Sequence, residues 1–148
     1  MKDEDLKVRG TLEIVLRGKT GKVKKKKKYK NLVVTTGLGF IASRMKDASA
    51  AVMSHIAIGS GTTAAAAGQT DLISTIGSRE AIDSSVVSGG AITYSTVFEA
   101  GEGTGAVTEA GIFNAVSSGT MLCRTVFPAI NIAPADTLSF TWTITLSV

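Results

Sequence analysis

The chain has 148 residues, a formal net charge of +4 at pH 7 and a single cysteine, and only 5% of its residues are aromatic. This length fits one domain, and one cysteine excludes an intrachain disulfide and a cysteine-rich zinc site. The first ten residues are charged, and no apolar run approaches the roughly 20 residues of a membrane-spanning helix. We therefore expect no secretory signal and no membrane association.

The N-terminal part of the chain predicts a β-hairpin. Leu12, Ile14 and Leu16 alternate with polar residues, which is the period of a half-buried strand. The glycine-flanked segment "GKTG" at 18–21 indicates a turn, and a second extended run follows it. We expect this hairpin to span about residues 8–35, and it could project from the domain as an arm.

One short helix is expected, at about residues 36–47. Leu38, Ile41, Ala42 and Met45 recur at the spacing of one helical face. Thr35 or Thr36 is a candidate N-cap.

The remainder of the chain reads as short strands separated by turns. Residues 53–61 and 78–88 are candidate strands around a loop, and the segment 128–136, which holds both prolines, reads as a connector. The final segment, 137–148, alternates most regularly between apolar residues and Ser or Thr. The large core side chains should be Phe98, Phe113, Phe127, Phe140 and Trp142.

About eight strands and one short helix predict an all-β fold, an antiparallel β-sandwich or jelly roll that forms a single domain over residues 1–148. The absence of alternating strand–helix units argues against an α/β fold.

Candidate catalytic and metal-ligating residues are few. His55, the only histidine, lies within an expected strand, and Cys123 lies in an apolar stretch, so we interpret both as structural. The segment "GSG" at 59–61 lacks the G-x-S-x-G frame of a nucleophile elbow. We expect no enzymatic activity and no cofactor.

The acidic residues offer two weak alternatives. Glu99, Glu102 and Glu109 could approach one another across a hairpin as a glycosidase-like pair, but the chain has few aromatic residues to line a sugar cleft. A calcium site built from three aspartates lacks the spacing of an EF-hand loop. These aspartates are Asp71, Asp83 and Asp136.

Several phrases, taken in order, carry a family resemblance. They are "KNLVVTTGLGFIASRM", "HIAIGSGTTAAAAGQTDL", "VFEAGEGTGAVTEAGIFNA", "GTMLCRTVFP" and "DTLSFTWTITLS". From about residue 10 to the C-terminus the chain resembles small virion structural proteins of tailed bacteriophages, which act as capsid decoration (cement) proteins or as tail- or fibre-associated proteins. The resemblance implies a non-enzymatic protein, made in the host cytoplasm and located in the virion. It also implies that the partners are the major capsid protein, other copies of this chain, or tail proteins.

A run of five lysines departs from the family's pattern. Residues 19–30 contain eight lysines and no acid, whereas the rest of the chain carries a net charge of −4. In an extended strand, alternate side chains point to opposite faces, so neither face of this segment can be fully buried. We therefore expect an edge strand or a projecting one. The candidate interaction residues are Lys22, Lys24, Lys25, Lys26, Lys27, Lys28, Tyr29 and Lys30.

Three interpretations of the lysines compete, and an anionic cell surface is a minor fourth. Lysines at a sheet edge discourage aggregation between sheets. They could instead bind an acidic neighbour, either another copy or the shell surface. Nucleic acid is the third alternative. It is not favoured, because base reading commonly uses Arg, Asn or Gln, and Tyr29 is the only aromatic residue in the segment.

Overall fold

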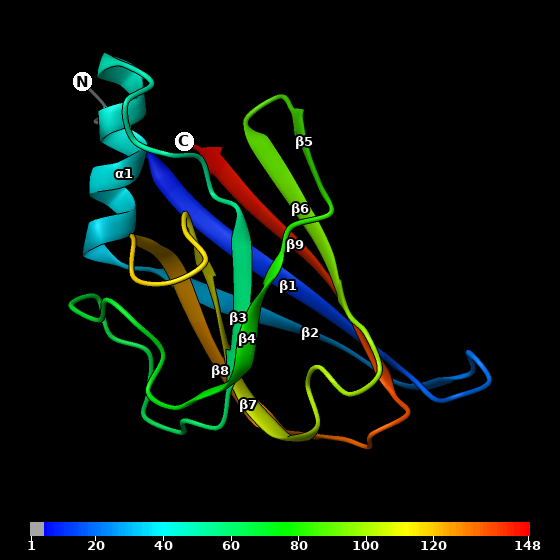
Figure 1. The fold of residues 1–148 in the computed structure, drawn as a ribbon. Helices are drawn as coiled ribbons and strands as arrows, with labels where there is room; N and C mark the ends of the chain where they lie inside the picture. Colours follow the sequence, from blue (N-terminus) through cyan, green and yellow to red (C-terminus); the bar gives the residue numbers. More distant parts are fainter. Residues whose placement is uncertain (1–4) are drawn as a thin grey trace.

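The computed structural model describes residues 5–148, which form nine antiparallel strands and one helix (Figure 1). The expected all-β, sandwich-like fold with one short helix is confirmed, with nine strands where about eight were expected. The order of strands in the sheet is β4-β3-β7-β8-β2-β1-β9-β6-β5. Their bounds are β1 (Lys7–Arg17), β2 (Val23–Val33), β3 (His55–Gly59), β4 (Thr75–Ala81), β5 (Ser84–Ser88), β6 (Ala91–Phe98), β7 (Gly105–Phe113), β8 (Met121–Ile132) and β9 (Thr137–Ser147).

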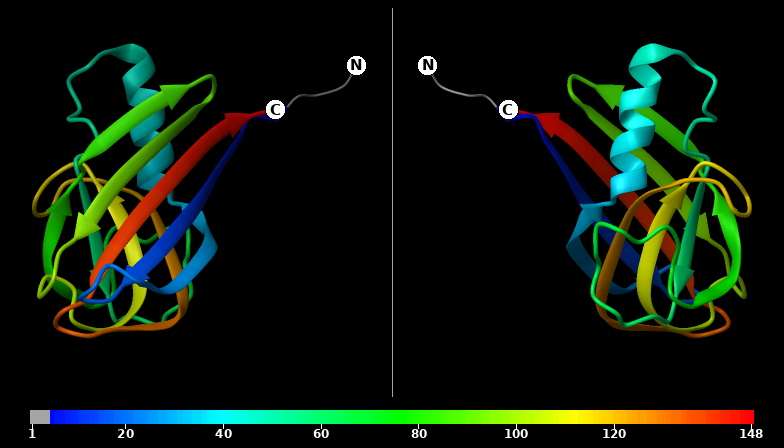
Figure 2. Two further views of the ribbon diagram at one scale, coloured as in Figure 1. Left: turned by 90° about the vertical axis from the view of Figure 1, so that its right-hand side faces the viewer. Right: turned by 90° about the vertical axis from the view of Figure 1, so that its left-hand side faces the viewer.

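The sheet is curled, and β2 joins its two halves. Along most of its length β2 pairs with β1, but it pairs with β8 only at Leu32 and Val33. The strands beyond β1 and those beyond β8 therefore diverge from this narrow join and face each other around the core (Figure 2). The β1–β2 hairpin is part of the sheet rather than a separate arm, because β1 also pairs with β9 from Lys7 to Arg17.

The core follows the alternation of the sequence. Leu12, Ile14 and Leu16 of β1 are all buried, and so are Phe140 and Trp142 of the neighbouring β9. The five large aromatic residues expected in the core are all buried, and Cys123 lies among them. Burial of apolar area is thus concentrated between the two halves of the curled sheet.

The segment 78–88, expected as one strand, forms parts of two. β4 ends at Ala81, and β5 begins at Ser84. Between them the amide of Ile82 donates to Ser54 O and that of Asp83 donates to Ser95 O. The chain crosses here from the half of the sheet that contains β3 to the half that contains β6, which explains the additional strand.

The segment 128–136 is only partly a connector, because β8 continues through Pro128 to Ile132. The pairing of β7 with β8 shifts register between Val107 and Glu109, opposite the segment that contains Pro128. A strand can hold proline at such a bulge because the ladder there does not require its missing amide hydrogen.

The helix, α1 (Thr35–Lys46), occupies the expected position but buries only part of the expected face. Leu38 and Met45 are 48% and 87% exposed, whereas Gly37 is buried and Phe40 and Ile41 pack against the core. A Cβ atom at Gly37 would overlap the backbone of Leu122, so glycine is what allows the helix to lie against β8. The expected N-cap at Thr35 or Thr36 is also wrong, because both residues lie within the helix.

The N-cap of α1 is Val34, which makes no side-chain cap bond. The hydroxyl of Thr36 instead donates to Met121 O, 3.2 Å away, and so ties the first turn of the helix to β8.

Candidate docking surface: the lysine strand and the anchored loop

The lysine strand, residues 22–30, has one free backbone edge. From Val23 to Asn31 it pairs with β1 on one side, and no described residue pairs with its other side by backbone hydrogen bonds. Among residues 5–148, the one side-chain hydrogen bond to this edge runs from the Thr125 hydroxyl to Lys30 O, at 2.9 Å. Such an edge presents unpaired amide and carbonyl groups to a partner.

One face of the lysine strand continues the core. Lys25, Lys27 and Tyr29 lie opposite the buried residues Leu16, Ile14 and Leu12 of β1, in that order. The ring of Tyr29 stacks on Phe127 of β8, with ring centroids 4.9 Å apart. Burial raises the pKa of Tyr29. This aromatic residue therefore closes the core where β2 and β8 separate.

The opposite face of the strand presents lysines to solvent, since Lys26, Lys28 and Lys30 are all exposed. Lys26 and Lys28 share one carboxylate, that of Glu13, at 3.8 and 3.7 Å. Exposed pairs at such distances contribute little stability. These contacts place the two lysines beside Glu13 of β1.

Lys24 makes the best-defined contact of the strand. Its ammonium group lies 2.8 Å from Asp136 Oδ2, and the same carboxylate accepts a hydrogen bond from the amide of Ala133. The Lys24 hydrogen bond and this amide hold the pKa of Asp136 below its usual range. Asp136, weighed above as a calcium ligand, therefore already has a cationic partner.

Four lysines of the strand make no ion pair with any residue in the range 5–148, and three of them are well exposed. They are Lys22, Lys25, Lys27 and Lys30. The strand thus keeps a surplus of positive charge on an exposed edge, which is the arrangement that an anionic surface would recognise.

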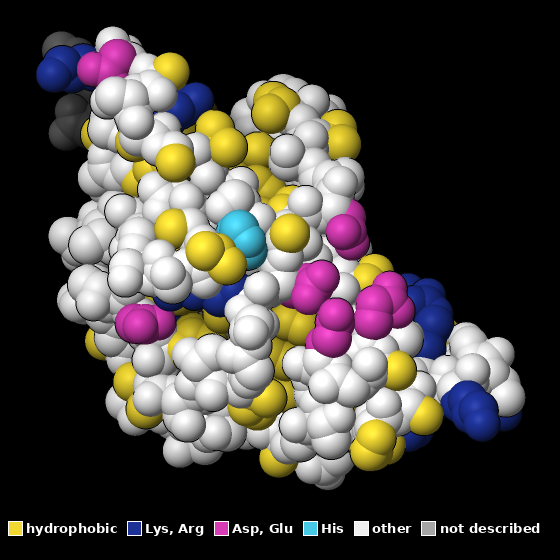
Figure 3. Space-filling view, viewed as in Figure 1, with side chains coloured by type: hydrophobic (Ala, Val, Ile, Leu, Met, Phe, Trp, Pro, Cys, Tyr) yellow, Lys and Arg dark blue, Asp and Glu magenta, His cyan; other side chains and the backbone are white. Residues whose placement is uncertain are grey.

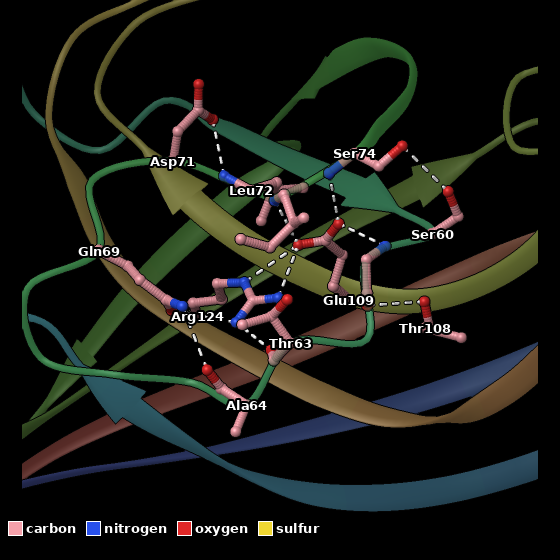
Figure 4. Close-up of polar contacts among 12 residues, drawn as sticks. Ser60, Thr63, Ala64, Gln69, Asp71, Leu72, Ser74, Thr108, Glu109 and Arg124 are labelled. Atoms are coloured by element: carbon pink, nitrogen blue, oxygen red, sulfur yellow. Dashed lines mark hydrogen bonds and ion pairs between the residues drawn. The ribbon is translucent and has the colours of Figure 1, made fainter.

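A buried ion pair lies in the other half of the sheet, where it anchors the loop of residues 60–74 (Figure 4). Glu109 on β7 and Arg124 on β8 are both fully buried. Arg124 Nε donates to Glu109 Oε1 at 3.0 Å. Its Nη2 atom lies 3.0 Å from the same oxygen, but at an angle that makes no hydrogen bond.

The carboxylate of Glu109 also accepts hydrogen bonds from the loop. The donors are the amides of Gly61, Ile73 and Ser74, at 2.6 to 2.9 Å. Burial alone would raise the pKa of Glu109, but these amides and Arg124 more than offset it, so its pKa lies below the ordinary value.

Arg124 holds the far side of the loop. Its Nη1 atom donates to Thr63 O at 2.8 Å and to the side-chain oxygen of Gln69 at 3.0 Å. The amide group of Gln69 in turn donates to Ala64 O. Two buried side chains therefore fix both ends and the middle of an exposed, alanine-rich loop.

Sequence reasoning missed this pair, although a signal was present. Glu109 and Arg124 are each charged residues within an otherwise apolar or small-residue strand, in "AVTEAGIF" and "MLCRTVF". Two opposite charges in buried strands indicate a paired site. Their proximity depends on the β7–β8 register, in which Arg124 lies opposite Gly111.

The structure separates Glu109 from the other two carboxylates weighed as a glycosidase-like pair. Glu109 is committed to Arg124, whereas Glu99 and Glu102 belong to the turn between β6 and β7. Glu102 accepts a hydrogen bond from the amide of Glu99 at 2.7 Å, and its charge helps to raise the pKa of Glu80. Asp71, weighed above as a calcium ligand, lies 3.8 Å from the guanidinium group of Arg79.

His55 and Cys123 both lie on strands of the sheet, His55 at the start of β3 and Cys123 within β8. His55 Nδ1 shares a hydrogen bond with the hydroxyl of the adjacent Ser54 at 2.8 Å. Cys123 is fully buried, and this burial raises the pKa of its thiol.

Within residues 5–148, no group of three or more His, Cys, Asp or Glu side chains is arranged to hold a metal ion. In the same part of the chain, no helix has the length and apolar character needed to cross a membrane. Comparison with protein-family models, curated proteins and solved structures found no match.

Proposed function

We propose that this protein is a non-enzymatic virion structural protein of a tailed bacteriophage, and specifically a capsid decoration (cement) protein that binds the assembled shell. The observation that carries the proposal is the lysine strand, an exposed strand with a free backbone edge and four lysines unpaired within the described chain. Such a strand offers both backbone groups and charge to an acidic protein surface.

The anchored loop supports the same function. A protein that reinforces a particle needs surfaces that keep their shape on binding, because ordering a mobile loop opposes association. Glu109 and Arg124 supply that rigidity to the loop of residues 60–74 through buried hydrogen bonds. The phrase resemblance to small virion proteins points in the same direction.

Nucleic-acid binding through the lysine strand is less well supported. Stacking on unpaired bases requires exposed aromatic rings. The one aromatic residue of the strand, Tyr29, stacks on Phe127 and belongs to the core surface. Charge alone would remain, and charge alone does not distinguish DNA from an acidic protein.

A binding assay with shells tests the proposal. Purified protein is mixed with assembled shells and, separately, with free coat protein, and the bound fraction is measured by sedimentation. We expect binding to assembled shells that weakens with salt, and little binding to free coat protein. The proposal would be contradicted if the protein did not bind assembled shells, or if it bound naked DNA at low salt more tightly than shells.

A tail, collar or fibre-base component is the second structural alternative. The same strand could dock there on fewer partners, so the assay is repeated with purified tails. Binding to tails alone would replace the decoration proposal.

A further inference from the structure

We propose that the lysine strand docks on a second copy of this chain, at a cluster of four carboxylates. The carboxylate cluster consists of Glu80, Asp83, Glu99 and Glu102. Glu80 and Glu102 line one groove, the amide of Glu99 donates to the Glu102 carboxylate, and Asp83 follows the end of β4 by two residues. This inference rests on the docking role proposed above for the lysine strand. Where copies lie side by side on the shell, the acidic surface that the strand contacts is that of the neighbouring copy.

The carboxylate cluster is assembled from three segments. Glu80 is near the end of β4, Asp83 lies in the link to β5, and the other two belong to the β6–β7 turn. Glu80 and Glu102 line a groove of about 310 Å³ beside the backbone of Gly77 and Gly101. The bond between Glu99 N and the Glu102 carboxylate holds this turn in shape.

The cluster has no cation partner among residues 5–148. No lysine or arginine in the described part of the chain forms an ion pair with any of its members. Burial raises the pKa of Glu80 most. The charge of Glu102, a side-chain hydrogen bond with Glu102, and the charges of Asp83 and Glu99 raise it further. Carboxylates that repel one another in this way are stabilised by a cation brought among them.

The lysine strand has the opposite imbalance, with Lys22, Lys25, Lys27 and Lys30 unpaired among residues 5–148. Figure 3 shows acidic side chains gathered right of centre on one face of the molecule, with Lys and Arg side chains beyond them toward the right-hand edge. Surplus charges of both signs therefore coexist on one chain without pairing. A second copy can satisfy both, and complementary charge also steers the encounter.

The lysines also exclude the simplest alternative contact between copies. Pairing two free β2 edges would place like charges beside one another, which is why lysines protect exposed edges. A contact between the lysine strand and the carboxylate cluster uses the same lysines attractively. Protection of the edge and docking are then two consequences of one feature.

Charge reversal on each surface tests the inference. One variant combines Lys22→Glu with Lys27→Glu, and the other combines Asp83→Lys with Glu99→Lys. All four side chains are exposed and make no ion pair recorded within the described chain. The mass of the full-length protein is measured by sedimentation velocity at roughly 50 mM and 500 mM salt, after nuclease treatment.

We expect the wild-type protein to associate at low salt and to dissociate at high salt. Each variant alone should associate roughly tenfold or more weakly, because one reversed surface faces an unchanged surface of the same sign. An equimolar mixture of the two variants should recover association, since each then presents what the other lacks. A control that combines Lys7→Glu with Lys46→Glu changes the net charge by the same amount as the Lys22→Glu, Lys27→Glu variant. This control should associate as the wild type does.

A wild-type protein that is monomeric at both salt concentrations would overturn the inference. So would a mixture that fails to recover association although both variants melt at the wild-type temperature. These outcomes are distinct from failure of the proposed function. A monomer that still binds assembled shells would leave that function standing, whereas a self-associating protein that ignores shells would contradict the function alone.

Discussion

Replacement of Glu109 by Gln should be among the most damaging single changes in this chain. The carboxylate serves the buried Arg124 guanidinium and the amides of Gly61, Ile73 and Ser74 at once. Removing one partner of a buried ion pair costs about 3–5 kcal/mol, because the other charge is left without compensation. We expect a loss of that size in the free energy of unfolding, out of about 5–15 kcal/mol for a typical domain.

The measurement is urea denaturation followed by circular dichroism, combined with hydrogen exchange. Exchange at Gly61, Ile73 and Ser74 should accelerate more than exchange elsewhere, since their acceptor is weakened. As a matched control, Glu13→Gln removes a carboxylate that only approaches two exposed lysines, at 3.7 and 3.8 Å. That change should alter stability by no more than about 0.5 kcal/mol.

The pH dependence gives a further check with a definite sign. The pKa of Glu109 is lowered in the folded protein. Its ionised form therefore stabilises the fold at pH values above 4.5, the ordinary pKa of a glutamate. This contribution is lost as the pH falls through the lowered pKa, and the difference between wild type and Glu109→Gln should shrink there. A cost below about 1 kcal/mol at neutral pH, or unchanged exchange in the loop, would show that Glu109 does not hold the loop in place.

Three further predictions concern other parts of the fold. Gly37→Ala should destabilise the protein by about 1–3 kcal/mol in urea denaturation, because its Cβ would overlap the backbone of Leu122; an unchanged midpoint would show that α1 can move away from β8. Glu80→Gln should raise stability at pH 7, since burial and neighbouring charge raise the pKa of Glu80 in the fold, and the gain should disappear as the pH falls below 4.5; a loss of stability at pH 7 would contradict this sign. Cys123 should react with a thiol reagent only in denaturant, because burial raises the pKa of its thiol and blocks access; rapid reaction in native buffer would argue against its buried position.

The β-strands could be predicted largely because apolar alternation is a local property. The regular pattern from Leu138 to Leu146 predicts β9. The apolar residues of this pattern from Leu138 to Ile144 are buried in the core, as expected. The helix shows the limit of such patterns. Leu38 and Met45 match a helical stripe, yet the buried face is centred on Gly37, whose close approach to β8 depends on tertiary packing.

The candidate site likewise contains one feature that the sequence predicts and others that depend on the fold. The lysine strand could be predicted because the run of lysines can be read from the sequence without knowledge of the fold. The Glu109–Arg124 pair and the carboxylate cluster depend on strand register and on which turns meet, so their members lie far apart in the chain. The break between β4 and β5 was missed for a similar reason, because the chain there changes its pairing partner without a glycine or proline.

The number of copies of this protein in purified particles is the measurement that bears most directly on shell decoration. Mass spectrometry against the major coat protein would supply it, with particles first separated into heads and tails. Decoration of the shell predicts a copy number comparable to that of the coat protein, with all copies in the head fraction. Absence from particles, or a few copies confined to the tail fraction, would contradict it.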